Sequence, residues 1–135
     1  FLVYGPGQNM SRFIPQVISG CLEDLDFPVS KAEQLRDFCF IEDIIDGILL
    51  AATKRSALGE VINLASGNPT SIRSIIEEIV NLIGSGRPQW GKLNYRIGEN
   101  MELYADITKA KKILKWKPKI TIKEGLKETI DFYKK

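Results

Sequence analysis

A stripe of isoleucines between residues 72 and 83 is the feature that most limits what this chain can fold into. Its apolar residues recur at the three- and four-residue spacing of a helix with one buried face. Asn68-Pro69-Thr70-Ser71 supplies a turn and an N-cap before the stripe, and Gly84 is placed as the C-terminal cap. We therefore predict a helix over 72–83 that packs into a single compact body, as 135 residues allow.

Other segments share the helical spacing and carry start or stop signals. Gly20 closes one of them, and Pro118 prevents another from continuing past Trp116. Thr121 with Glu124 forms a capping box, which typically opens a helix. The predicted helices run over 11–19, over 41–52, from an N-cap at Asp106 to 114, and from 121 onward.

Short extended segments alternate with these helices, so the predicted class is α/β with a short mixed sheet and several packed helices. A strand over 1–4 meets the turn Gly5-Pro6-Gly7, and Phe27–Val29 and Gln34–Phe38 read as two strands around a turn. Residues 60–64 read as a buried strand and residues 92–96 as a half-buried one. With the helix between these last two, they predict a small right-handed βαβ unit.

The charge balance and the missing residue types exclude several functions. Lysine and arginine total 19 against 17 acids, a net charge of +2, which argues against nucleic acid as the main partner. There is no histidine, so the usual general base and zinc ligand are absent. Cys21 and Cys39 are interpreted as buried small hydrophobes in a reducing compartment. No apolar run is long enough for a membrane span, so we expect a cytoplasmic protein. We also expect no metal site.

The last thirty residues carry a local excess of positive charge. From Asp106 onward there are ten lysines and four acids. A membrane or nucleic-acid patch is one interpretation of this excess. The other is a solvated helical face, because the lysines are interleaved with buried-face residues at helical spacing, and this is the interpretation we favour.

The chain lacks the patterns that hold a dinucleotide or carry out its chemistry. No Gly-x-Gly-x-x-Gly or Gly-x-x-Gly-x-x-Gly run is present, although a pyrophosphate needs such glycines at a strand-to-helix turn. No tyrosine has a lysine four residues later, the spacing by which lysine lowers the pKa of a phenol. We therefore expect no cofactor-binding and no catalytic residues within these 135 positions.

Two arginines and one glutamate are the candidates for binding. Arg36 and Arg96 each stand at the end of a predicted strand, and a guanidinium is well shaped to clamp a diphosphate. Glu99 follows Arg96 by three residues and suits ribose hydroxyls. The alternative is that both arginines make ordinary surface ion pairs, for instance Arg36 with neighbouring acids.

Five motifs, in order, resemble the extended short-chain dehydrogenase/reductases that epimerise or dehydrate nucleotide sugars. The first, Val3-Tyr4-Gly5-Pro6-Gly7-Gln8, is similar to the strand and turn that follow the catalytic tyrosine and lysine of that family. The second, residues 35–43, resembles its Arg-Asp-aromatic segment. The others are residues 60–67, similar to its next strand and glycine turn, and 105–110 and 114–118, similar to its closing helices.

The resemblance implies roles for single residues. Arg36 and Arg96 would hold the diphosphate and Glu99 the nucleotide ribose. Arg12 falls near a position that touches the nucleotide, although an exposed helix arginine would look the same. Phe27 and Val29 would flank the nucleobase, although core packing explains them equally well. Asp37 and Asp43 are interpreted as structural acids that bond backbone groups and cap a helix.

For the whole enzyme, the resemblance implies NAD or NADP, a Tyr/Lys pair in an amino-terminal Rossmann domain, and a homodimer formed through that domain. Residues 1–10 would be the remnant of the last Rossmann strand and turn, and residues 11–135 the domain that binds a nucleoside-diphosphate sugar. We expect the isolated chain to be inactive. A stand-alone nucleotide-binding module without turnover is the alternative. A scaffold whose clamp has decayed is a third possibility, because Leu2 replaces the usual asparagine of the family.

Overall fold

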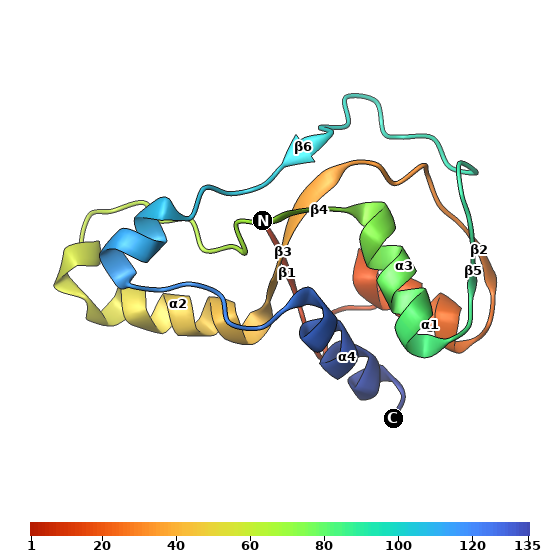
Figure 1. Ribbon diagram of the computed structural model, residues 1–135, viewed down its shortest axis with the longest axis horizontal. Helices are drawn as coiled ribbons and strands as arrows, with labels where there is room; N and C mark the ends of the chain where they lie inside the picture. Colours follow the sequence, from red (N-terminus) through yellow and green to blue (C-terminus); the bar gives the residue numbers. More distant parts are fainter.

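The computed structural model describes all 135 residues and is organised around one central strand, β3 (Leu35–Phe40). The second half of β3 pairs in parallel with β1 (Leu2–Tyr4). Its first half pairs antiparallel with β4 (Pro69–Ser71) and parallel with β6 (Glu102–Leu103). The result is the short mixed sheet that the sequence predicts, with β3 in its middle (Figure 1).

A second, separate sheet contains β2 (Asp26–Pro28) and β5 (Arg87–Gln89), which pair in parallel. The two strands predicted around a turn are both present, as β2 and β3, but they belong to different sheets and do not pair with each other. Long-range polar contacts hold β2 beside β5 instead: the Arg87 guanidinium bonds the Asp26 carboxylate at 2.5 Å and the Asp24 carboxylate at 2.8 Å. These partners lie about sixty residues apart in sequence, beyond the reach of a local turn rule.

Three helices enclose the main core on one side of the sheet. They are α1 (Phe13–Leu22), α3 (Ile72–Ile83) and α4 (Ile122–Tyr133), which lie together in Figure 1. Apolar side chains that are at most 5 % exposed fill the space between them and strands β1 and β3. These include Tyr4, Ile14, Val17, Ile18, Phe38, Phe40, Ile75, Ile76, Ile79, Leu126 and Ile130.

A smaller core lies on the other face of β3. Because successive side chains of a strand point to opposite faces, Phe38 and Phe40 enter the main core while Cys39 enters the second one. There Cys39 packs with Ile44 of α2 (Ile41–Thr53) and with Trp116. The 3-10 turn Arg55–Ala57 and the π-type turn Ala110–Leu114 complete this side. Strand β3 therefore separates the main core from the smaller second core.

Helix ends follow the predicted capping chemistry in most places. The Ser71 hydroxyl accepts the Ser74 N–H, and Gly84 ends α3 in the left-handed conformation that favours glycine. Thr121 and Glu124 form the capping box of α4. Gly20 is the exception: α1 continues past it to Leu22. A methyl group at this position would lie 3.0 Å from the Phe27 ring, so the glycine provides room for Phe27 rather than an end to the helix.

Two predicted strands and the βαβ unit built on them are wrong. Residues 60–64 and 92–96 form no strand. In the first segment Ile62 and Leu64 pack against the second core, but Val61 is 83 % exposed, so the segment is not the buried strand that was predicted. The segment forms no ladder with β3, which pairs with β1 over residues 38–40 and with β4 and β6 in its first half. Residues 92–96 run as a loop beside β2, where the Leu93 N–H donates to the Val29 carbonyl.

Each core contains one free cysteine. Cys21 and Cys39 are both almost fully buried and unpaired, which confirms them as small core residues. Burial raises the pKa of Cys21 to about 11, and burial together with the nearby Asp43 and Asp37 carboxylates raises that of Cys39 to about 12. No helix combines the length and the apolar character needed to cross a membrane.

Candidate functional site

The largest hollow of functional interest, here called the main cavity, lies between α1, α3, β2 and the loop that follows β5. Its volume is about 570 Å³. Apolar side chains from several elements form its wall, and polar groups from the loop line its rim. The apolar lining comprises Phe13, Val17, Phe27, Pro28, Val29, Ala32, Ile72, Ile76 and Leu93; the polar lining includes Ser30, Gln34, Asn94, Tyr95, Arg96 and Glu99.

Two smaller cavities follow the main cavity in a row, and each neighbouring pair shares lining residues. The Arg12 cavity, of about 270 Å³, shares Ser11, Phe13 and Arg96 with the main cavity. The glycine-turn cavity, of about 350 Å³, extends along β1 to Gly5-Pro6-Gly7 and shares Arg12 with the Arg12 cavity. The three hollows therefore form a series, with an arginine at each of the two junctions.

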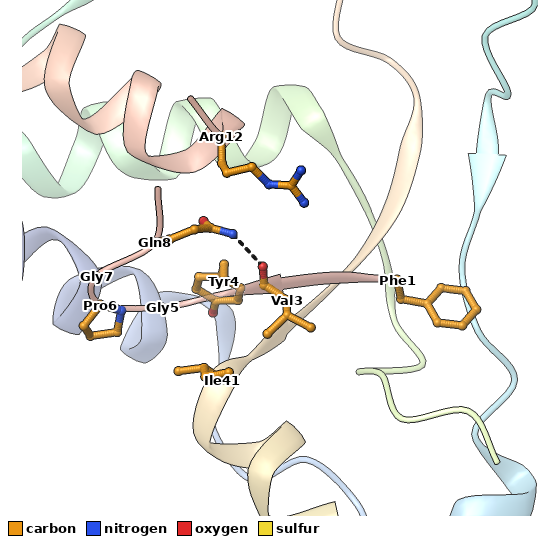
Figure 2. A pocket seen from close by; sticks show the side chains of 9 residues that line it. All are labelled: Phe1, Val3, Tyr4, Gly5, Pro6, Gly7, Gln8, Arg12 and Ile41. Carbon is orange, nitrogen blue, oxygen red and sulfur yellow. Dashed lines mark hydrogen bonds between the residues drawn. The ribbon is translucent and has the colours of Figure 1, made fainter. Parts of the chain in front are cut away.

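The glycine-turn cavity is mostly backbone and apolar surface. Figure 2 shows the Arg12 guanidinium on the same side of β1 as the Gln8 carboxamide, which donates to the Val3 carbonyl at 2.9 Å. Phe1 lies toward one end of this surface and the Gly5-Pro6-Gly7 turn toward the other. Arg12 is exposed and forms no salt bridge, so its positive charge is available to a ligand.

Arg36 and Arg96 both lie beside Glu99, but only Arg96 lines a cavity. The Glu99 N–H donates to the Arg96 carbonyl at 3.0 Å, and the Glu99 carboxylate forms an ion pair with Arg36. The Arg36 and Glu99 side chains are only 11 % and 18 % exposed. Arg96 is exposed, has no ion pair, and faces both the main and the Arg12 cavities. Arg36 lies behind Glu99 and lines none of the three cavities.

The positions of Phe27 and Val29 agree with core packing and also give both residues access to a cavity. Each lines the main cavity, and each is half-buried against the main core. Packing of Phe27 against Gly20 fixes the position of its ring. The apolar wall of the main cavity is thus an extension of the core, which gives it a rigid shape.

Asp37 is a structural acid, as predicted. Its carboxylate is fully buried and accepts the Ser66 N–H at 2.7 Å, the Gly67 N–H at 2.9 Å and the Ala105 N–H at 3.3 Å. These bonds fasten two loops to β3. The residue next to the candidate binding arginine Arg36 therefore anchors the strand that carries it.

Asp43 bonds backbone groups too, although not those of its own helix. Its carboxylate accepts the Lys119 N–H at 2.9 Å and the Ile120 N–H at 3.0 Å, and its carbonyl accepts the indole N–H of Trp116. It does not cap α2, whose N-cap has no side-chain hydrogen bond. Asp106 accepts the Thr108 N–H at 2.8 Å where the next helical stretch begins, in keeping with its predicted capping role.

Sequence reasoning did not single out several residues that line the cavities. Tyr95 holds the loop in place, because its hydroxyl bonds the Glu33 N–H and carboxylate at 3.1 Å. Gln34 lines the main cavity just before β3 begins. Leu93 and Tyr95 alternate with polar neighbours, a pattern that predicts a strand, but both residues lie in a loop. Gln34 carried no local signal, because its position depends on how β3 meets α3.

Comparison with known proteins places this geometry in a family. Residues 3–129 match the family model described as GDP-mannose 4,6 dehydratase. The chain is 38 % identical to a UDP-glucuronate 4-epimerase of Thermodesulfobacterium geofontis, over 99 % of this chain and 41 % of that protein.

Two solved structures are similar over 99 % of the chain. The UDP-glucuronic acid 4-epimerase from Bacillus cereus, in complex with UDP-glucuronic acid and NAD, is 32 % identical with a TM-score of 0.88 and is covered over 43 % of its length. MoeE5, in complex with UDP-glucuronic acid and NAD, is 28 % identical with a TM-score of 0.89 and is covered over 45 %. The chain thus spans about two fifths of the length of the relatives it matches. It belongs to the GDP-mannose 4,6 dehydratase family, within the extended short-chain dehydrogenase/reductases that epimerise or dehydrate nucleotide sugars.

Proposed function

We propose that the chain is the nucleotide-sugar-binding part of an NAD(P)-dependent epimerase, dehydratase or reductase. In this proposal residues 1–10 continue the last strand and turn of a cofactor domain, and residues 11–135 hold the substrate. The observation that carries it is the series of three adjoining cavities with Arg96 and Arg12 at the junctions. The complexes of the relatives with UDP-sugars agree with this assignment.

The chemistry of each cavity suits one part of a nucleoside-diphosphate sugar. The main cavity has an apolar wall with a polar rim, which suits a nucleoside between Phe27 and Val29. The two exposed arginines at the junctions suit the diphosphate. The glycine-turn cavity, next in the series, is where the sugar would lie. Glu99 lines the main cavity, so it can face ribose hydroxyls only by sharing its carboxylate with Arg36.

The residues of this chain do not fit a dinucleotide cofactor. A pyrophosphate needs free N–H groups at a strand-to-helix turn. The turn after β1 contains Pro6, which has no N–H, and α1 begins only at Phe13 with Pro15 in its first turn. We therefore assign the cofactor and the Tyr/Lys pair to a part of the enzyme outside residues 1–135. The contribution of this part is orientation, which brings the sugar into reach of the reacting groups.

Isothermal titration of the 135-residue chain with UDP tests the proposal. We expect measurable binding that weakens about 10-fold or more in Arg96→Ala, because a charge-assisted bond to phosphate is lost. Arg36→Ala should weaken binding as well if Arg36 reaches the diphosphate. Arg55→Ala is the matched control, since Arg55 is exposed, unpaired and outside the cavities. If UDP binds to Arg96→Ala and to Arg36→Ala with the same affinity as to the native chain, the role of these two arginines in holding the diphosphate is disproved.

Turnover is the second test. Incubation with UDP-glucuronic acid and NAD should yield neither NADH absorbance nor an epimerised sugar. Product formation by the isolated chain would show that it contains a cofactor site and would overturn the assignment of chemistry to another domain.

A further inference from the structure

One buried polar side-chain atom in the molecule has no hydrogen-bond partner, and it belongs to a residue that lines the main cavity. Among buried side-chain nitrogens and oxygens, Gln34 Oε1 alone lacks a hydrogen bond. The backbone of the same residue is well fixed, because its carbonyl accepts the Ile72 N–H at 3.1 Å. The side chain lines the main cavity together with Arg96 and Glu99.

A carboxamide oxygen without a partner is costly to bury, so its presence calls for a reason. Leaving such a group unpaired costs about 1 to 3 kcal/mol, and folded proteins pair nearly all of them. The terminal amide of glutamine rotates over a broad, shallow range, so a ligand in the cavity can meet either its oxygen or its nitrogen. We propose that Gln34 is a nucleoside-recognition residue whose carboxamide pairs with a neighbouring donor and acceptor on the ligand. This inference rests on the function proposed above.

The position of Gln34 favours the nucleoside over the charged part of the ligand. Gln34 lines the main cavity but neither of the other two, whereas Arg96 and Arg12 stand at the junctions where a diphosphate would lie. A carboxamide is neutral and offers one acceptor and two donors. It therefore complements an uncharged group that presents both a donor and an acceptor.

Two parts of a uridine nucleotide offer that chemistry. The imide edge of the base places an N–H beside a carbonyl oxygen, and the ribose carries hydroxyls that both donate and accept. Two UDP analogues separate them: N3-methyl-UDP removes the donor of the base, and 2′-deoxy-UDP removes one hydroxyl of the ribose.

The test is Gln34→Met, which keeps the length of the side chain and removes both polar atoms. UDP affinity, measured by titration calorimetry, should fall about 3- to 10-fold, while inorganic pyrophosphate binds within twofold of the native chain. The urea midpoint of the free variant should stay unchanged or rise, because an unpaired buried oxygen is removed. Gln89→Met is the control, since that amide already donates to the Arg87 carbonyl and lies outside the cavity.

The outcomes separate this inference from the proposed function. If the native chain binds no UDP, both fail together. If it binds UDP and Gln34→Met binds UDP equally well, the role of Gln34 is disproved and the proposed function stands. Equal weakening toward UDP and pyrophosphate, or a lowered urea midpoint, would assign Gln34 a structural role and overturn the inference. If the native chain binds UDP more tightly than one of the two analogues and Gln34→Met binds both equally well, the group altered in that analogue is the one that Gln34 recognises.

Discussion

Two carboxylates on opposite sides of Arg36 behave in contrasting ways. Asp37 follows it in sequence, is fully buried, and accepts three backbone N–H groups. Glu99 approaches it from a distant loop, lines the main cavity, and has Arg36 as its only side-chain partner. Full pairing with immobile backbone groups makes an acid an anchor. A single pairing with one side chain, beside a cavity, leaves an acid able to exchange partners when a ligand arrives.

The contrast is tested most strongly by Asp37→Ala. We expect the free energy of unfolding to fall by about 3 to 5 kcal/mol, because three backbone N–H groups lose a fully buried, charged acceptor. Urea titration followed by tryptophan fluorescence, from Trp90 and Trp116, measures this change. Asp46→Ala is the control: Asp46 is exposed and pairs only with Lys119, so its loss should cost less than about 1 kcal/mol. A similar small cost for Asp37→Ala would remove the distinction between anchor and exchangeable acid.

The two cores can also be compared through their thiols, because one cysteine lies in each core. At pH 8 a thiol with a pKa of about 11 is ionised about 100-fold less than one at 9, so Cys21 should react with a thiol reagent about 100-fold more slowly in the folded chain than after unfolding. Cys39 should be about 10-fold slower again, since the Asp43 and Asp37 carboxylates add to burial in raising its pKa to about 12.

Because both pKa values are raised, the labelling rates should climb as pH increases toward 11 and 12. Mass spectrometry of peptides from the labelled native chain resolves the two sites. Faster labelling at Cys39 than at Cys21 would show that the Asp37 side of the sheet is the more open half.

Glu99→Gln should have the smallest effect. It should strengthen the binding of an anion, whereas the loss of an anchoring acid weakens the fold. Removing the charge loosens the hold on Arg36, so pyrophosphate affinity should rise about 3-fold. The pair is mostly buried, but the Gln amide oxygen can still accept from Arg36, so the free energy of unfolding should fall by less than about 2 kcal/mol. If Glu99 also accepts ribose hydroxyls, the gain for UDP should be smaller than the gain for pyrophosphate. Calorimetry with both ligands gives the ratio. A loss of stability above about 2 kcal/mol would place Glu99 with Asp37 among the structural acids.

Local signals predicted those parts of the fold that depend on a few neighbouring residues. The stripe from Ile72 to Ile83 gave α3 its bounds and its buried face, and the Thr121–Glu124 capping box marked the start of α4. The interpretation of Asp37 as a structural acid followed from its motif and was correct. These signals work because a helix pairs its own backbone within four residues, so its sequence contains most of its determinants.

Strand assignments failed where the partner was distant. A segment becomes a strand only if its backbone pairs with a neighbouring strand, and residues 60–64 pair with none. The two residues of β6 form a strand only because β3 lies beside them. The candidate site shows the same limit: residue type and spacing proposed Arg96 and Glu99, which line the main cavity, whereas no local signal pointed to Gln34, which lines it as well.

The sequence by itself determined the helices, several of their caps, and the structural role of Asp37. Only the tertiary structure decided which strands pair, that Glu99 meets Arg36, and that Gln34 ends beside a cavity with an unpaired oxygen. The physical reason is that capping and periodicity are properties of adjacent residues. Ladders, ion pairs across the chain and cavities exist only after distant segments have been brought together.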